Sequence, residues 1–70
     1  MAQELVKIYS LVKKYKEGER NFTGINLNEA NLSRINLSQA NLSDASLCVS
    51  NLSAADLTGS NLSRANLNVA

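Results

Sequence analysis

One spacing dominates this sequence: a large apolar side chain recurs every five residues from Phe22 to Leu67, and after the first position it is always leucine. In register, residues 20–69 divide into ten consecutive units, which read RNFTG, INLNE, ANLSR, INLSQ, ANLSD, ASLCV, SNLSA, ADLTG, SNLSR and ANLNV. A period of five matches neither the 3.6-residue stripe of a helix nor the 2-residue alternation of a strand. Each unit must therefore contain more than one backbone conformation.

The five positions of a unit divide into an extended part and a corner. The first three are small or apolar, polar and apolar, as in Ala40, Asn41 and Leu42, which predicts a very short strand with one buried face. The last two are small or polar, as in Ser43 and Asp44, and suit a turn. A chain that turns after every five residues and sends each leucine inward winds into a solenoid. The period alone leaves open how many corners complete one coil.

The repeated A-(N/D)-L-x-x pattern resembles the pentapeptide-repeat family, and this resemblance covers residues 20–70. It implies an all-β solenoid, a right-handed quadrilateral β-helix in which four pentapeptides make one square coil and the first and third positions point inward. Residues 20–39, 40–59 and 60–70 would then form about two and a half coils. The expected core consists of the third-position side chains and two first-position isoleucines: Phe22, Ile25, Leu27, Leu32, Ile35, Leu37, Leu42, Leu47, Leu52, Leu57, Leu62 and Leu67.

An amphipathic helix is expected before the repeats. At 100° per residue, the segment 3–17 places its large apolar residues on one broad arc, with polar residues opposite. The residues on this arc are Leu5, Ile8, Tyr9, Leu11, Val12 and Tyr15. Gly18 is expected to end the helix as a left-handed C-cap. The chain is thus predicted to comprise a capping helix, residues 1–19, and a repeat domain, residues 20–70.

The apolar arc is expected to cover the open end of the first coil, because repeat arrays need caps over their terminal rungs. The two first-position isoleucines, Ile25 and Ile35, and the one aromatic at a leucine position, Phe22, all lie in this coil, where they would widen the contact with the helix. Residues 15–29, which read Y-x-x-G-x-R-N-F-x-x-I-N-L-x-E, also resemble the start of bacterial pentapeptide-repeat proteins. These include cyanobacterial regulators with such a capping helix, which are thought to act by binding another protein.

The opposite end of the repeats has no comparable cap in this sequence, which finishes with Asn68, Val69 and Ala70. Leucines of the last coil would then lie near an exposed rung. Two interpretations stay open. Either these residues are the head of a longer array, or two copies form a homodimer through the open C-terminal coil.

The residue types argue against catalysis. The sequence contains no histidine, so a Ser–His or Cys–His nucleophile pair is impossible. Glu29, Asp44 and Asp56 are scattered along the repeats rather than paired. We therefore expect no enzymatic activity, no metal site and no cofactor. A single Cys48 excludes an internal disulfide, and charges interrupt the first twenty residues, so we expect a protein of the reducing cytoplasm without a signal peptide.

The outward residues leave one candidate site. When every fourth unit is aligned, Val49 and Val69 share a column beside Cys48, and together they form an outward apolar strip. This strip is a candidate partner-binding patch; the alternative is that scattered surface valines have no role. The second-position asparagines also allow two interpretations. They either form hydrogen bonds along a face of the solenoid or simply make its exterior polar.

Three classes of function are compatible with the repeats. The favoured one is a non-enzymatic protein-interaction or scaffold module, which includes a regulatory role, with an unidentified protein as partner. A DNA mimic acting on topoisomerases, a role that the resemblance implies for some members, needs a strongly acidic surface. The formal net charge here is +1, and nucleic acid is not expected as a partner either. Membrane attachment through the lysine-bearing helix is disfavoured, since it would compete with capping for one apolar face.

Overall fold

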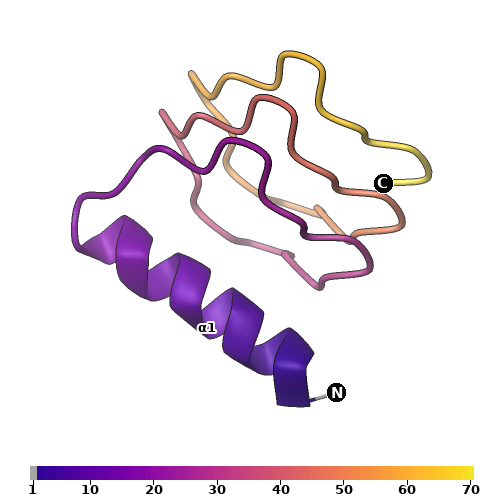
Figure 1. Ribbon diagram of the computed structural model, residues 1–70, viewed down its shortest axis with the longest axis horizontal. Coiled ribbons are helices and arrows are strands. Elements are labelled where there is room, and N and C mark those ends of the chain that lie inside the picture. Colours follow the sequence, from indigo (N-terminus) through magenta and orange to yellow (C-terminus); the bar gives the residue numbers. More distant parts are fainter. Residues whose placement is uncertain (1) are drawn as a thin grey trace.

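The computed structural model describes the backbone of residues 2–70 and the side chains of residues 5–70. It contains one helix, α1, which spans Ala2–Lys16, followed by a backbone that winds into stacked coils (Figure 1). Helix α1 lies across one end of the stack, and the C-terminal residues form the other end (Figure 1). The arrangement is a β-helix capped by a helix at its N-terminal end.

Helix α1 ends one residue earlier than predicted, and glycine terminates it as expected. Gly18 adopts a φ of 101°, in the left-handed half of conformational space. The amide of Gly18 donates to the carbonyl of Tyr15 at 3.0 Å, and the amide of Glu19 donates to the carbonyl of Lys14 at 2.9 Å. These two bonds are those of a Schellman motif, which satisfies carbonyls that a helix end leaves unpaired. The predicted C-cap at Gly18 is confirmed.

Every repeat ends in the same β-turn. From Ile25 to Ala70, the first-position amide of each unit donates to the preceding third-position carbonyl, at 2.9 to 3.3 Å. The fifth-position residue between them always has a positive φ, from 58° at Arg64 to 73° at Gly24. A hydrogen-bonded turn whose third residue is left-handed reverses the chain sharply. The chain therefore has one corner in every five residues.

The coils stack with a register of twenty residues. Isolated parallel bridges join second-position residues of successive coils, from the pair Asn21 and Asn41 to the pair Ser46 and Asn66. The third-position amides donate to the next coil as well, as from Phe22 to the carbonyl of Asn41 at 2.8 Å. Four pentapeptides therefore make one coil, as the family resemblance implies.

The three-residue strands predicted from the alternation do not form within the described residues. Each bridge is a single residue at the second position, as at Asn31 and Asn51. The physical reason is the turn itself, which uses the third, fourth and fifth positions and the first position of the next unit. Only the second position is left to pair as a strand.

The interior is filled by first- and third-position side chains. The buried residues of the repeats are Phe22, Leu27, Ala30, Leu32, Leu37, Ala40, Leu42, Ala45, Leu47 and Ser50. The hydroxyl of Ser50 donates to the carbonyl of Leu47 at 2.8 Å, so this buried polar side chain is paired. The prediction that the first and third positions point inward is confirmed for these residues.

Burial falls off toward the last coil. Leu52, Leu57 and Leu62 are partly buried and pack against the core, whereas Leu67 is 41% exposed. Assigning Leu67 to the core was therefore wrong, because within residues 2–70 no further coil lies over its rung. At the other end, Ile25 and Ile35 are only partly buried but pack against the core as predicted.

Helix α1 covers the first coil with a narrower stripe than predicted. Leu11 is buried, and Ile8 and Tyr15 pack beside it against the core. In contrast, Leu5 is 73% exposed and Tyr9 is 70% exposed, so placing them on the capping face was wrong. The predicted arc runs over about 160° of the helix surface at 3.6 residues per turn. A helix resting on the end of a coil contacts it along a narrower line, and here that line is centred on Leu11.

Tyr15 ties the helix to the first coil. Its hydroxyl donates to the carbonyl of Ser38 at 2.7 Å. The guanidinium of Arg20 lies 3.6 Å from the centre of the Tyr15 ring, a cation–π contact, and its Nη1 donates to the carbonyl of Tyr15 at 2.8 Å. The helix end, the linking residues and the coil are thereby held together.

The gradient of burial predicts a gradient of mutational cost. Leu42→Ala, in the middle of the stack, should lower the free energy of unfolding by about 2–5 kcal/mol, because it leaves a cavity in a fully buried site. Leu67→Ala should lower it by less than about 1 kcal/mol, since that side chain is already partly in water. Urea denaturation followed by circular dichroism measures both, and equal losses would contradict the gradient.

Candidate functional site

The candidate site predicted from the sequence lies on one outer corner of the coils. We call Cys48, Val49 and Val69 the outer strip. The amide of Val49 donates to the carbonyl of Asn68 at 2.9 Å, which stacks the two valine corners in successive coils. Val49 is 55% exposed and Val69 is 74% exposed, while Cys48 is half-buried and its thiol is free. The structure therefore brings the two valines together on the outside, with the cysteine beside Val49 in sequence.

Both valines of the outer strip adopt an unfavourable backbone conformation. Val49 and Val69 each have a φ of 60°. For an L-amino acid this region costs about 1–2 kcal/mol, and a β-branched side chain makes it rarer still. Gly24 occupies the same position in its unit without such a cost. The turn imposes the left-handed conformation at every fifth position, but it does not require a β-branched apolar residue there.

The polar second positions serve the turns rather than a ladder between coils. In nine of the ten units, the side-chain oxygen of this residue accepts a hydrogen bond from the amide two residues later, at 2.9 to 3.3 Å. This local pattern is an Asx-turn, and it leads the chain into each corner. The interpretation that these side chains form hydrogen bonds along a face is therefore wrong for these nine units, because each oxygen accepts a bond within its own unit.

The remaining unit, ASLCV, solves the same problem differently, and it contains Cys48 and Val49 of the outer strip. Its second position is Ser46, whose short side chain does not replace the asparagine. Asn28, from the preceding coil, accepts hydrogen bonds from the amide of Cys48 at 2.9 Å and from the hydroxyl of Ser46 at 2.5 Å. The backbone at Cys48 is therefore held by a residue twenty positions earlier.

Sequence reasoning missed this role of Asn28. A signal was present, because the unit ASLCV has neither asparagine nor aspartate at its second position. The missing acceptor could have directed attention to the neighbouring coil. Aligning every fourth unit already places Asn28 in the column of Cys48, but only the structure shows that its side chain reaches across to the next coil.

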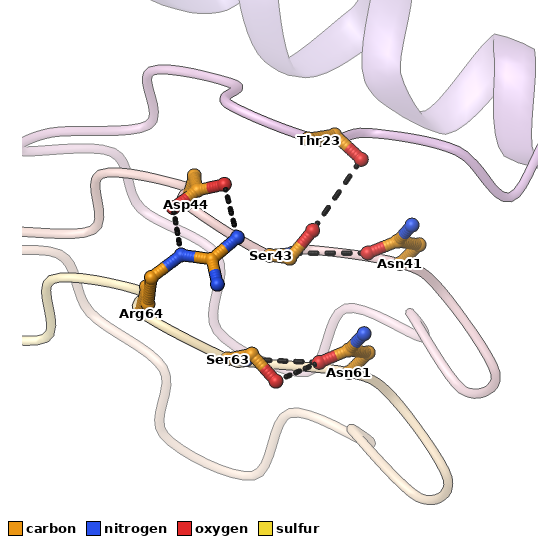
Figure 2. A network of polar contacts seen from close by, with 7 residues as sticks. All are labelled: Thr23, Asn41, Ser43, Asp44, Asn61, Ser63 and Arg64. Atoms are coloured by element: carbon orange, nitrogen blue, oxygen red, sulfur yellow. Dashed lines mark hydrogen bonds and ion pairs between the residues drawn. The ribbon is translucent and has the colours of Figure 1, made fainter.

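The neighbouring column of corners carries a salt bridge between coils. Arg64 contacts Asp44 through Nε at 2.8 Å and through Nη2 at 3.0 Å, between successive coils (Figure 2). The hydrogen bonds from Arg64 lower the pKa of Asp44 and raise the pKa of Arg64. Hydrogen bonds from Thr58 lower the pKa of Asp56. Since Asp44 and Arg64 face solvent, the pair aligns the coils more than it stabilises them.

The regular turns, the inward leucines and the twenty-residue coils agree with the comparison of this sequence with known families. Residues 21–47 and 50–70 match the family model of pentapeptide repeats, in eight copies. The chain belongs to the pentapeptide-repeat family. No curated protein and no solved structure matches it. The two residues between the matched segments of this pentapeptide-repeat protein are Cys48 and Val49, both in the outer strip.

Family membership identifies the chain as a repeat protein. In the part of the chain that the structure describes, no three histidine, cysteine, aspartate or glutamate side chains come together as a metal site would require. Helix α1, the one helix found in residues 2–70, lacks the length and apolar character needed to cross a bilayer.

The strain at Val49 predicts a stabilising substitution. Val49→Gly should raise the free energy of unfolding by up to about 1 kcal/mol, because relief of the left-handed strain exceeds the greater flexibility of glycine in the unfolded chain. Gly24→Val is the matched reverse, since a side chain there would meet no atom within 4 Å. It should lower the free energy of unfolding by about 1–2 kcal/mol. Thermal unfolding measures both, and changes of the same sign would contradict this account.

The role of Asn28 predicts a loss that a second substitution restores. Asn28→Ala should lower the free energy of unfolding by about 1 kcal/mol, because the amide of Cys48 loses its acceptor. Adding Ser46→Asn should restore most of this stability by supplying the usual acceptor within the unit. Asn68→Ala, in the same column, should change stability by less than about 0.5 kcal/mol. Chemical denaturation measures the stability of each variant. If Ser46→Asn does not restore the stability lost in Asn28→Ala, the account in which Asn28 replaces the missing acceptor of residue 46 is wrong.

Proposed function

We propose that this pentapeptide-repeat protein is a non-enzymatic interaction module that presents the outer strip to a partner protein. The observation that carries this proposal is the pair Val49 and Val69, stacked in successive coils, exposed, and each held at a φ of 60°. Every fifth-position residue shares this conformation, but among them only Val49 and Val69 are β-branched, for which it is least favourable. An exposed apolar pair on a rigid scaffold is also a common element of protein interfaces.

The scaffold suits such a role. Hydrogen bonds between coils set the spacing of the corners, so neighbouring side chains of a column have fixed relative positions. A binding surface that is already ordered loses little entropy when a partner binds. A regulatory role is one form that such an interaction would take. The proposal includes a cytoplasmic location, in keeping with the free thiol of Cys48.

The proposal also includes right-handed winding, which the family resemblance implies. Connections that return the chain to a parallel neighbouring strand are right-handed in nearly all proteins. The bridges between these coils are parallel. The same stereochemical preference therefore favours a right-handed coil here.

A second copy of the chain is a further candidate partner, at the open end of the stack. Third- and fifth-position amides donate to carbonyls of the next coil; the amides of Leu47 and Val49 are examples. Within residues 2–70, the third- and fifth-position amides from Leu52 to Val69 have no further coil to donate to. The exposed side chain of Leu67 lies at the same end of the stack. Unpaired strand edges of this kind pair readily with other chains. Covering by further repeats would satisfy the same groups.

The DNA-mimic alternative has no comparable support. Among the acids of the repeats, Asp44 is paired with Arg64, which leaves little exposed negative charge to imitate a phosphate backbone. We therefore retain the protein-interaction role as the proposed function.

The test compares the full chain with charged variants of the outer strip. Val49→Lys and Val69→Lys should fold normally but lose proteins that the unmodified chain captures, as measured by affinity purification and mass spectrometry. Ala54→Lys is the matched control, because Ala54 is an exposed fifth-position residue with a φ of 59° in a different column. Its captured proteins should match those of the unmodified chain. An identical set for all four proteins would remove the outer strip as a binding surface.

A further inference from the structure

Helix α1 carries two apolar stripes, and only one of them caps the coils. Ile8, Leu11 and Tyr15 pack on the first coil, as described above. A second stripe consists of Leu5, Tyr9 and Val12, of which Leu5 and Tyr9 are exposed and Val12 is half-buried. Its spacing of four and then three residues is that of a seam between two packed helices. Capping therefore leaves a helix-pairing surface unused.

Beside this second stripe lies an apolar groove between α1 and the first coil. The groove has a volume of about 390 Å³, and its walls include Val12 and Lys16 from the helix and Arg34, Ile35 and Leu37 from the coil. A second hollow of about 220 Å³ shares Val12 and Lys16 with it and extends along the helix to Tyr9 and Lys13. We call this combined surface the helix groove.

The charge around the helix groove is positive. Lys13, Lys16 and Arg34 line it, against one acid, Glu17. The ion pair that the structure describes, Arg64 with Asp44, lies elsewhere and neutralises none of these cations. An occupant complementary to this surface has apolar side chains for the floor and carboxylates for the rim.

Other occupants match the helix groove less well. A second α1 helix would bring its own Lys13 and Lys16 to a surface that is already cationic, and like charges would oppose pairing. A lipid bilayer is broad and flat, so it would reach Leu5 and Tyr9 but leave the floor between Val12 and Ile35 unfilled. A helical segment of another protein fits both the concave shape and the heptad-like spacing.

We propose that the helix groove binds an acidic amphipathic helix of another protein. Its apolar residues, spaced by four and three, pack on Leu5, Tyr9 and Val12, and its carboxylates pair with Lys16 and Arg34. This surface shares no residue with the outer strip. The inference therefore stands or fails independently of the strip, and each can be tested without disturbing the other.

The test uses a synthetic fluorescein-labelled peptide of about 15 residues, a length at which a helix begins to be stable. The peptide has leucines spaced by four and three residues, glutamates beside them and alanines elsewhere. Fluorescence anisotropy should show saturable binding to the full chain, and nuclear magnetic resonance should show shifts at Val12, Ile35 and Leu37. Lys16→Glu should weaken binding by about tenfold or more, as expected when a paired interfacial charge is reversed.

Two controls separate this site from general attraction between opposite charges. Lys14→Glu makes the same charge change on α1 outside the residues that line the groove, and it should change affinity by less than about twofold. A peptide with serines in place of its leucines should not bind. Equal weakening by Lys14→Glu and Lys16→Glu, or equal binding of the serine peptide, would overturn the proposal.

Two further measurements test the other occupants. Sedimentation with vesicles of equal phosphatidylglycerol and phosphatidylcholine tests a membrane surface, and analytical ultracentrifugation tests self-association. Vesicle binding that is lost in Tyr9→Ser, without peptide binding, would assign the stripe to membranes. Dimerisation that is lost in Tyr9→Ser would assign it to a second copy. Either result would overturn the proposal and would leave the outer strip unaffected.

Discussion

One hydrogen bond, repeated in every unit, controls the architecture of this protein. It runs from the first-position amide to the preceding third-position carbonyl and closes a turn around a left-handed fifth-position residue. Because the turn recurs every five residues without interruption, four turns return the chain to a point directly beneath its start. The inward leucines stack only because the corners do. Without the corner, the same leucines would have no common interior to occupy.

The two ends of the stack differ in solvent exposure: helix α1 covers one end, and the side chain of Leu67 is partly exposed at the other. Leu11 and Tyr15 of α1 close the first coil, so its leucines are fully buried. At the other end, Leu67 remains partly exposed. In a repeat protein each coil is stabilised by its neighbours, so a coil with one neighbour is less stable than a coil with two. Burial is accordingly complete at the third positions of the first coil and becomes partial at Leu52 and Leu57 in the second.

Regularity makes the departures from it informative. Most second positions carry an asparagine that stabilises its own turn, whereas Ser46 depends on Asn28 from the coil before. The same unit ends in Val49, an apolar β-branched residue held in a conformation suited to glycine. Neither departure improves the scaffold. Both concern its outer surface, where the proposed partner would bind.

The sequence by itself determined the repeating corner, the inward direction of the leucines, the capping helix, the glycine that ends it and the column shared by Val49 and Val69. Apart from the column, which also rests on the four units per coil implied by the family resemblance, these features follow from spacing and from local backbone preferences. The tertiary structure decided which stripe of α1 covers the coil, because the arc from Leu11 to Tyr9 offered more apolar surface than the coil end can contact. It also decided that Asn28 holds Cys48 and that a cationic groove lies between Lys16 and Arg34. Those arrangements join residues about twenty positions apart, and their geometry exists only after the coils have stacked.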